Sequence, residues 1–118
     1  MAGQTLKSDQ PHVTEFRRLV YDATRQIPPA RAATYGWVAR TAGCGSPRAV
    51  GGALRANPFA PEVPCHRVVS ADGSLTGFGG SSDTAALKKK RRLLESEGVR
   101  FDVNGRVDPA CLLTPDRP

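Results

Sequence analysis

Residues 34–58, TYGWVARTAGCGSPRAVGGALRANP, decide the fold, because this stretch is typical of two short helices joined by a tight turn. Thr34 and Ser46 stand where N-caps are expected, since a hydroxyl oxygen can accept a hydrogen bond from the free N–H groups of a first helical turn. Pro47 suits the first position of the second helix, and Gly43 can end the first helix in a left-handed conformation. Two short helices connected in this way predict a helix-turn-helix.

The second of these helices has arginines at both ends and glycines between them. Arg48, Gly51, Gly52 and Arg55 fall largely on the side opposite its apolar residues. Small residues on a solvent face would let the helix backbone come close to the floor of a groove in DNA. An ordinary helical hairpin, whose glycines are packing points, fits the pattern equally well. The pattern of this helix leaves both interpretations open.

The flanking segments predict further helices and a little β structure. Apolar residues at steps of three and four predict an amphipathic helix over residues 13–26. Residues 83–98 predict another helix, which contains the basic run KKKRR (88–92), a run typical of a solvated face. A short strand is expected over residues 66–70, and a hairpin about the pair Asn104-Gly105. The predicted fold class is mainly α with a small β hairpin, in a winged-helix-like helix-turn-helix domain.

The length of 118 residues fits one domain. We expect residues 1–12 to be a flexible N-terminal arm and residues 108–118 to be a loose tail. Residues 13–107 would then form the folded domain.

Charge and cysteine content narrow the classes of function. A net charge of +6 favours a polyanionic partner. The three cysteines are odd in number and none has C-x-x-C spacing, which argues against a disulfide framework and a structural zinc site. Cys44 and Cys111 are expected to be small buried hydrophobic residues. No apolar run reaches the ~20 residues of a membrane span, and the N-terminus has no apolar leader. We therefore expect an intracellular protein, in the cytoplasm or the nucleus, without a membrane partner.

Cys65 directly before His66 is the pair that points to chemistry. The thiolate is the nucleophilic form of cysteine, so Cys65 needs a base to take its proton. His66 is the candidate for this base, because His12 lies in the expected N-terminal arm. Adjacent side chains of an extended chain point to opposite faces, so we expect a water to bridge Cys65 and His66. A third group must orient such a base, and Glu95 and Glu97 are the candidates. One Cys and one His are too few ligands for a zinc site.

The motif around this pair resembles that of a known family. PCHRVV (64–69) strongly resembles the active-site motif of O6-alkylguanine-DNA alkyltransferases, also called methylated-DNA–protein-cysteine methyltransferases. TYG (34–36) resembles the start of the family's first helix-turn-helix helix, and RAVGGALRANP (48–58) resembles its recognition helix and asparagine hinge. GFGG (77–80) is similar to its active-site loop, and KRRLLESEG (90–98) to its closing helix. These motifs follow in the family's order over residues 16–98.

The resemblance implies a catalytic role for five residues. Cys65 matches the cysteine that accepts the alkyl group in one irreversible turnover. His66 matches the residue that takes the thiol proton through a water, and Glu97 the carboxylate that orients this histidine. Asn57 matches the hinge that ties the recognition helix to the active-site turn. Tyr35 matches the tyrosine that helps to rotate the target nucleotide and donates a proton to the leaving base.

The same resemblance implies that residues 13–107 form a DNA-binding domain, which carries the active site, a DNA-binding surface and a substrate pocket. Arg48 matches the arginine that enters the base stack in place of the flipped nucleotide. The DNA-binding set is completed by Gly51, Gly52, Arg55 and Tyr35, and the pocket by Pro64, Val68, Phe78, Gly79 and Lys90. The implied partner is double-stranded DNA containing O6-alkylguanine, bound through the minor groove by a monomer with the nucleotide flipped out. Neither a metal nor an organic cofactor is expected, because the protein itself is the consumed reagent.

This sequence departs from the family in three respects. We expect it to correspond to the family's C-terminal domain alone, without the N-terminal RNase H-like domain of the classical members. Several residues are added between Gly80 and Lys90, and Phe78 stands where the family often has a tyrosine. The single-domain size is similar to alkyltransferase-like proteins, which bind O6-alkylguanine and recruit nucleotide excision repair proteins.

Three functions are weighed on these grounds. Alkyltransferase-like sensors have another residue at the cysteine position, so Cys65 favours a single-turnover transferase. The non-enzymatic lesion sensor is the alternative. A plain basic helix-turn-helix binder with an inert cysteine would require the Cys-His-Asn-Glu set to be a coincidence.

Overall fold

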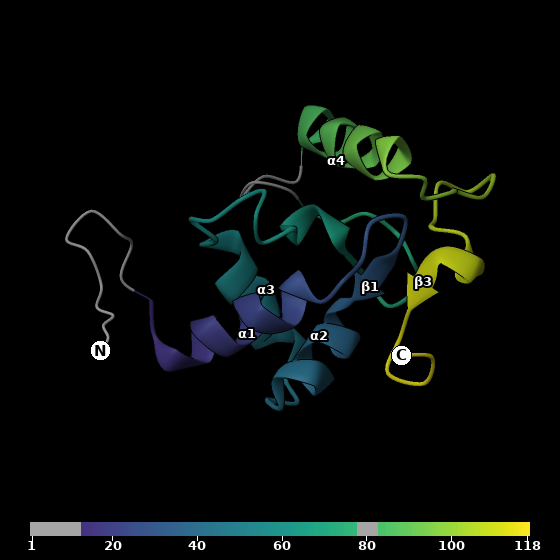
Figure 1. The fold of residues 1–118 in the computed structure, drawn as a ribbon. Coiled ribbons are helices and arrows are strands. Elements are labelled where there is room, and N and C mark those ends of the chain that lie inside the picture. The colour runs from purple at the N-terminus through teal and green to yellow at the C-terminus, as the bar shows by residue number, and fades with distance from the viewer. Residues whose placement is uncertain (1–12, 78–82) are drawn as a thin grey trace.

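The computed structural model describes residues 13–77 and 83–118. Figure 1 shows α1, α2 and α3 gathered on one side of the molecule and α4 at the opposite side. In chain order the elements are α1 (Glu15–Arg25), β1 (Ala32–Thr34), α2 (Tyr35–Ala42), α3 (Pro47–Arg55), the 3-10 turn η1 (Cys65–Arg67), β2 (Val68–Val69), α4 (Thr84–Ser96), the 3-10 turn η2 (Pro109–Cys111) and β3 (Leu112–Leu113). The expected N-terminal arm and two predicted pocket residues, Phe78 and Gly79, lie outside the described residues.

The predicted helix-turn-helix is formed by α2 and α3. Thr34 Oγ1 accepts a hydrogen bond from the backbone N–H of Trp37 at 3.0 Å, and Ser46 Oγ accepts one from Ala49 at 3.2 Å. Gly43 ends α2 with φ of 78°, a left-handed conformation that costs glycine little. The capping residues read from the sequence are therefore confirmed.

The three N-terminal helices share one hydrophobic core. Val20 of α1, Val38 of α2 and Val50 of α3 are fully buried, and burying each side chain stabilises the fold by about 1.5–3 kcal/mol. Tyr21 crosses this core and donates its hydroxyl hydrogen to the Ala53 carbonyl of α3 at 2.8 Å. The recognition-helix candidate α3 is thus held to α1 by packing and by a buried hydrogen bond.

The β structure differs from the predicted arrangement. The sheet has three parallel strands in the order β2-β1-β3, with Ala33 opposite both Val68 and Leu113. The predicted hairpin is present only as a tight turn, closed by one antiparallel bridge between Phe101 and Val107. Strands of two or three residues leave no alternation to read in the sequence, and parallel pairing joins residues far apart in the chain.

The expectation of a loose C-terminal tail is wrong for residues 109–113. β3 pairs with β1, and Cys111 is only 5% exposed. The side chain of Asp108 caps η2 by accepting a hydrogen bond from the Ala110 N–H at 3.0 Å. These residues complete a second core, which comprises Ala32, Val69, Leu94, Val99, Val107 and Cys111. Cys111 is a small buried hydrophobic residue as predicted, and Cys44 is half-buried against the first core.

In residues 13–77 and 83–118, none of the helices combines the length and the apolar character that crossing a membrane requires.

Candidate active site

Cys65, His66 and Arg67 together form the 3-10 turn η1, which leads directly into β2. The expectation that Cys65 and His66 lie in extended chain is therefore wrong. A 3-10 helix has three residues per turn, so successive side chains point about 120° apart rather than to opposite faces. Cys65 is half-buried and His66 is 5% exposed. The turn directs three consecutive side chains into three different surroundings.

His66 is held by a carboxylate from the end of α4. Its Nε2 lies 3.0 Å from Oε2 of Glu97, the residue that caps this helix. A carboxylate accepts hydrogen bonds, so Nε2 carries the proton and Nδ1 of the neutral ring is an acceptor. Glu95, the other carboxylate considered, lies on the exposed side of α4 and pairs with Arg91 at 3.1 Å. The structure brings together His66 and Glu97, and leaves Glu95 outside the site.

Arg67 is a member of this cluster to which the sequence analysis gave no role. Its Nε donates to Glu97 Oε1 at 3.0 Å and its Nη2 to Oε2 at 2.8 Å, a two-pronged ion pair. These hydrogen bonds from Arg67 are the largest cause of the lowered pKa of Glu97, and those from His66 add to it. The sequence did contain a chemical signal for this role. A guanidinium group can bind both oxygens of a carboxylate, and Arg67 directly follows the Cys-His pair.

Lys90 corrects the expectation that residues 88–92 form a solvated basic face. Lys88, Lys89 and Arg92 are exposed, but Lys90 is 1% exposed. Its Nζ donates to the Val68 carbonyl at 2.6 Å and to the Gly77 carbonyl at 2.9 Å. Burial lowers the pKa of Lys90 to about 8, and a negative charge on Cys65 acts against this shift. Lys90 thus ties β2 to Gly77 and places a buried amine near the nucleophile candidate.

The buried amine predicts a specific pH dependence of stability. Because the pKa of Lys90 is about 8 in the folded protein and about 10.5 in the unfolded chain, the unfolded state binds more protons between these values. Stability therefore rises with pH in this window. Between pH 7 and pH 10 the free energy of unfolding of the wild type should gain about 2 kcal/mol relative to Lys90→Met, measured by urea denaturation. Lys88→Met, on the exposed face, is the control. A constant difference between wild type and Lys90→Met would contradict the burial of a charged amine.

Asn57 joins the end of α3 to the segment before η1. Its Nδ2 donates to the Val63 carbonyl at 3.0 Å, and its Oδ1 accepts from the Phe59 N–H at 2.9 Å. Both hydrogen bonds hold the loop that runs into Pro64 and Cys65. Pro64 is buried before the turn, and Val68 is fully buried after it. Asn57 therefore links the end of α3 to the loop that leads to the candidate nucleophile.

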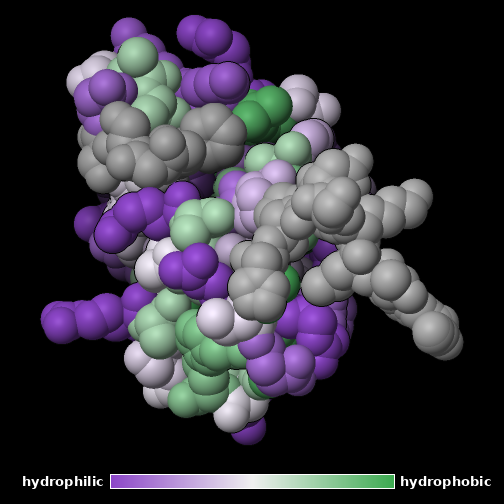
Figure 2. Space-filling model, turned by 90° about the vertical axis from the view of Figure 1, so that its left-hand side faces the viewer, coloured by the Kyte–Doolittle hydropathy of each residue, from purple (hydrophilic) through white to green (hydrophobic). Residues whose placement is uncertain are grey.

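Tyr35 and the predicted DNA-binding residues lie along α2 and α3. Tyr35 is half-buried at the start of α2, and its hydroxyl shares a hydrogen bond with Thr76 Oγ1 at 3.3 Å. Arg48, Gly52 and Arg55 are exposed on α3. A methyl group at Gly51 would lie 3.9 Å from the Tyr35 ring. Figure 2 shows hydrophilic side chains projecting from the face of the molecule that lies on the left in Figure 1.

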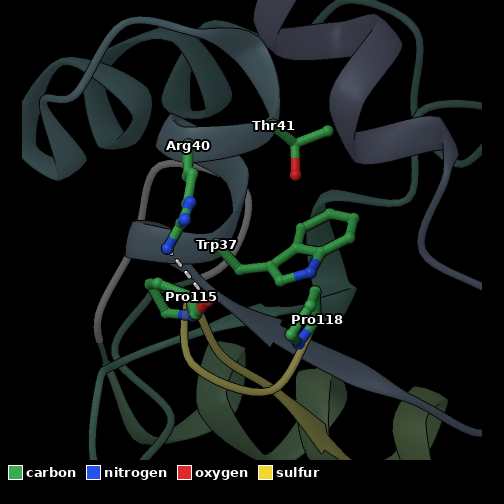
Figure 3. A pocket seen from close by; sticks show the side chains of 5 residues that line it. All are labelled: Trp37, Arg40, Thr41, Pro115 and Pro118. Atoms are coloured by element: carbon green, nitrogen blue, oxygen red, sulfur yellow. Dashed lines mark hydrogen bonds between the residues drawn. The ribbon is translucent and has the colours of Figure 1, made fainter.

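A separate pocket lies between α2 and the C-terminal segment, as Figure 3 shows. It has a volume of about 190 Å³ and is lined by Trp37, Arg40, Thr41, Pro115 and Pro118. Arg40 closes one side by donating to the Pro115 carbonyl at 3.1 Å. None of the predicted site residues lines this pocket, so it is distinct from the cluster around Cys65. Among the described residues, no three His, Cys, Asp or Glu side chains are grouped as ligands for a metal ion.

The sequence matches one protein family over most of its length. Residues 15–99 match the family described as 6-O-methylguanine DNA methyltransferase, DNA binding domain. The chain is 46% identical over 89 residues to the methylated-DNA–protein-cysteine methyltransferase of Methanothermobacter thermautotrophicus, covering 75% of this chain and 47% of that protein. The enzyme of the same name from Haemophilus influenzae is 39% identical over 93 residues, which cover 78% of this chain and 49% of that enzyme. This chain spans about half the length of the curated relatives it matches.

Solved structures show the same similarity. Mycobacterium tuberculosis OGT in complex with DNA aligns with a TM-score of 0.66 at 43% identity, over 74% of this chain and 52% of that one. Schizosaccharomyces pombe Atl1, solved with damaged DNA containing O6-carboxymethylguanine, aligns with a TM-score of 0.69 at 30% identity. That alignment covers 89% of this chain and 100% of the Atl1 chain.

Proposed function

This chain belongs to the family of the 6-O-methylguanine DNA methyltransferase DNA-binding domain, and from that membership we propose that it repairs O6-alkylguanine in double-stranded DNA by transferring the alkyl group to Cys65. The observation that carries the proposal is the pairing of His66 with Glu97 at 3.0 Å beside a half-buried cysteine. A nucleophile, a base and a group that orients the base are the three parts that nucleophilic catalysis by a thiol requires.

The proposed transfer moves two protons and exchanges one bond. The thiol proton of Cys65 passes through a water to Nδ1 of His66, the ring nitrogen that does not face Glu97. The sulfur forms a bond to the alkyl carbon while the bond from this carbon to O6 breaks, and its electron pair stays on the guanine. Tyr35 donates a proton to the departing guanine, and the proton taken up by His66 is released to water, from which Tyr35 regains one. The product is a thioether, which water does not cleave readily, so each chain reacts once.

The target nucleotide is proposed to reach Cys65 by leaving the base stack. The alkyl group on O6 lies inside the duplex, and extruding the nucleotide costs a few kcal/mol. We propose that α3 lies in the minor groove, where the exposed Gly52 allows close approach and Arg48 fills the vacated position in the stack. Exposed basic residues such as Arg55 would contact phosphates, so the affinity should fall as salt increases.

Arg48 is expected to act on the damaged strand rather than on DNA in general. Because its side chain is proposed to stabilise only the flipped state, Arg48→Ala should slow transfer from O6-methylguanine by about tenfold or more, and change the Kd for undamaged DNA by less than about threefold. Arg55→Ala, at the other end of the exposed face of α3, is the matched control and should weaken binding to both DNAs alike. Equal losses on both DNAs for Arg48→Ala would contradict the stack-filling role. Single-turnover kinetics and fluorescence anisotropy give the two quantities.

A lesion sensor without transfer activity is the second candidate. The alignment with Atl1 favours it, since that protein was solved in complex with damaged DNA containing O6-carboxymethylguanine. The thiol at position 65 favours transfer instead, because a sensor needs no nucleophile. The two are separated by digesting the DNA after incubation and measuring its O6-methylguanine content by chromatography. A transferase lowers this content by one equivalent per active chain, whereas a sensor leaves it unchanged.

A further inference from the structure

We propose that Arg67 is a positioning residue for the reaction at Cys65, because its guanidinium fixes the direction of the Glu97 carboxylate and balances its charge, and so keeps His66 able to accept a proton. The proposal rests on the proposed function only in naming that reaction. It concerns a side chain from the same 3-10 turn as the nucleophile and the base.

Arg67 is anchored on three sides. Its side chain is 15% exposed, and the two prongs to Glu97 measure 3.0 and 2.8 Å. Its remaining terminal nitrogen, Nη1, donates to the Ile27 carbonyl at 2.8 Å, and Ile27 is itself 1% exposed. A guanidinium held in this way has one orientation. The carboxylate plane of Glu97 therefore also has one orientation, fixed by two parallel hydrogen bonds.

The fixed carboxylate determines which nitrogen of His66 is free. Glu97 Oε2 receives both Arg67 Nη2 at 2.8 Å and His66 Nε2 at 3.0 Å. If the carboxylate rotated, the bond to Nε2 would lengthen and the imidazole could turn. Because Arg67 prevents this rotation, Nδ1 stays directed away from Glu97 and remains the acceptor for the proton from Cys65. Arg67 acts through Glu97, and does not touch the substrate.

The charge of Arg67 has a second consequence. In the part of the chain that the structure describes, the titratable groups that interact with those of η1 are Glu97 at the end of α4, Lys90 within α4 and Tyr21 of α1. Of these, Glu97 is the negative group in contact with His66. An unbalanced carboxylate favours a charged imidazole, which cannot accept a proton. With Arg67 on the same carboxylate, the attraction of Glu97 for a positive ring is reduced.

Two substitutions separate orientation from charge. Arg67→Lys keeps the positive charge but loses the two-pronged geometry, whereas Arg67→Met loses both with a similar aliphatic length. We expect Arg67→Met to raise the pH at which half of the His66 rings carry a second proton by about one unit. For Arg67→Lys this pH should stay within about 0.3 units of the wild type, while transfer becomes about tenfold slower.

The measurement is a pH titration of the full chain by nitrogen-15 NMR of the imidazole rings. His12, the other histidine in the sequence, serves as the internal reference. Single-turnover transfer rates of the three proteins are measured in parallel. If the His66 midpoint does not move in Arg67→Met, or if Arg67→Lys transfers as fast as the wild type, the proposal is wrong. Should Arg67→Met fail to fold, the rate of Arg67→Lys still decides whether the two-pronged geometry matters.

The titration needs no transfer activity, so the two proposals fail separately. A wild type that transfers nothing, combined with a raised His66 midpoint in Arg67→Met, would overturn the proposed function and leave the role of Arg67 intact. If the wild type transfers normally and the His66 midpoint is unchanged in Arg67→Met, the role of Arg67 is overturned and the proposed function stands.

Discussion

Replacing Cys65 by serine should abolish alkyl transfer while leaving the affinity for DNA containing O6-methylguanine within about threefold of the wild type. The serine hydroxyl is nearly isosteric, but it stays protonated near neutral pH and is a far weaker nucleophile than a thiolate. Cys65 is half-buried rather than part of the fully buried core, so the exchange should not disturb the fold. Single-turnover transfer and fluorescence anisotropy with the same oligonucleotide give the two quantities.

Cys44→Ser is the matched control for this experiment. Cys44 is also half-buried, and it lies in the turn between α2 and α3, where no role in the reaction is proposed for it. This variant should transfer at the rate of the wild type. Loss of both transfer and DNA binding in Cys65→Ser would indicate that Cys65 is a structural residue, and would contradict its assignment as the nucleophile.

His66→Gln should lower the transfer rate by about a hundredfold to a thousandfold at neutral pH, the range expected for loss of a general base. Glutamine can still donate a hydrogen bond to Glu97, but it cannot accept the proton of the thiol. The difference between the two rates should shrink as the pH rises, because hydroxide in alkaline solution can take the thiol proton of Cys65 without a base from the protein. The two rates should therefore converge in alkaline solution.

The control for this second prediction is His12→Gln, which removes the other histidine of the sequence. Its pH–rate profile should be that of the wild type. If His66→Gln had the rate and the pH profile of the wild type, proton transfer through His66 would be excluded, and the ion pair with Glu97 would have to be structural.

Local features of the sequence predicted much of the helical structure. Thr34 and Ser46 cap their helices through hydrogen bonds within three residues, so their role depends on neighbours in sequence and could be read directly. The same holds for Asp83, whose side chain accepts a hydrogen bond from the Ala86 N–H at 2.9 Å. The sheet could not be read in this way, since β1 pairs with strands that lie more than thirty and more than seventy residues further along the chain.

For the candidate site too, the sequence indicated some residues, and missed those whose role depends on distant partners. The resemblance to the family indicated Cys65, His66 and Glu97, and the structure pairs the last two across 31 positions of sequence. Lys90 was expected at the pocket rim within an exposed basic run, but it is buried because β2 and Gly77 supply carbonyl partners for its amine. Arg67 was missed for a related reason: its acceptors are 30 and 40 positions away. Burial of a charged side chain depends on such distant partners, which a local pattern does not contain.

Transfer of an alkyl group from DNA to Cys65 changes the mass of this chain, and intact mass spectrometry detects the change directly. The full chain is incubated with a duplex oligonucleotide containing one O6-methylguanine, and the modified residue is located by peptide mapping. We expect each active chain to gain the mass of one methyl group in place of one hydrogen, with the modification on Cys65 and none on Cys44 or Cys111. An unmodified chain that nevertheless binds the damaged duplex tightly would contradict this transfer and identify the protein as a lesion sensor.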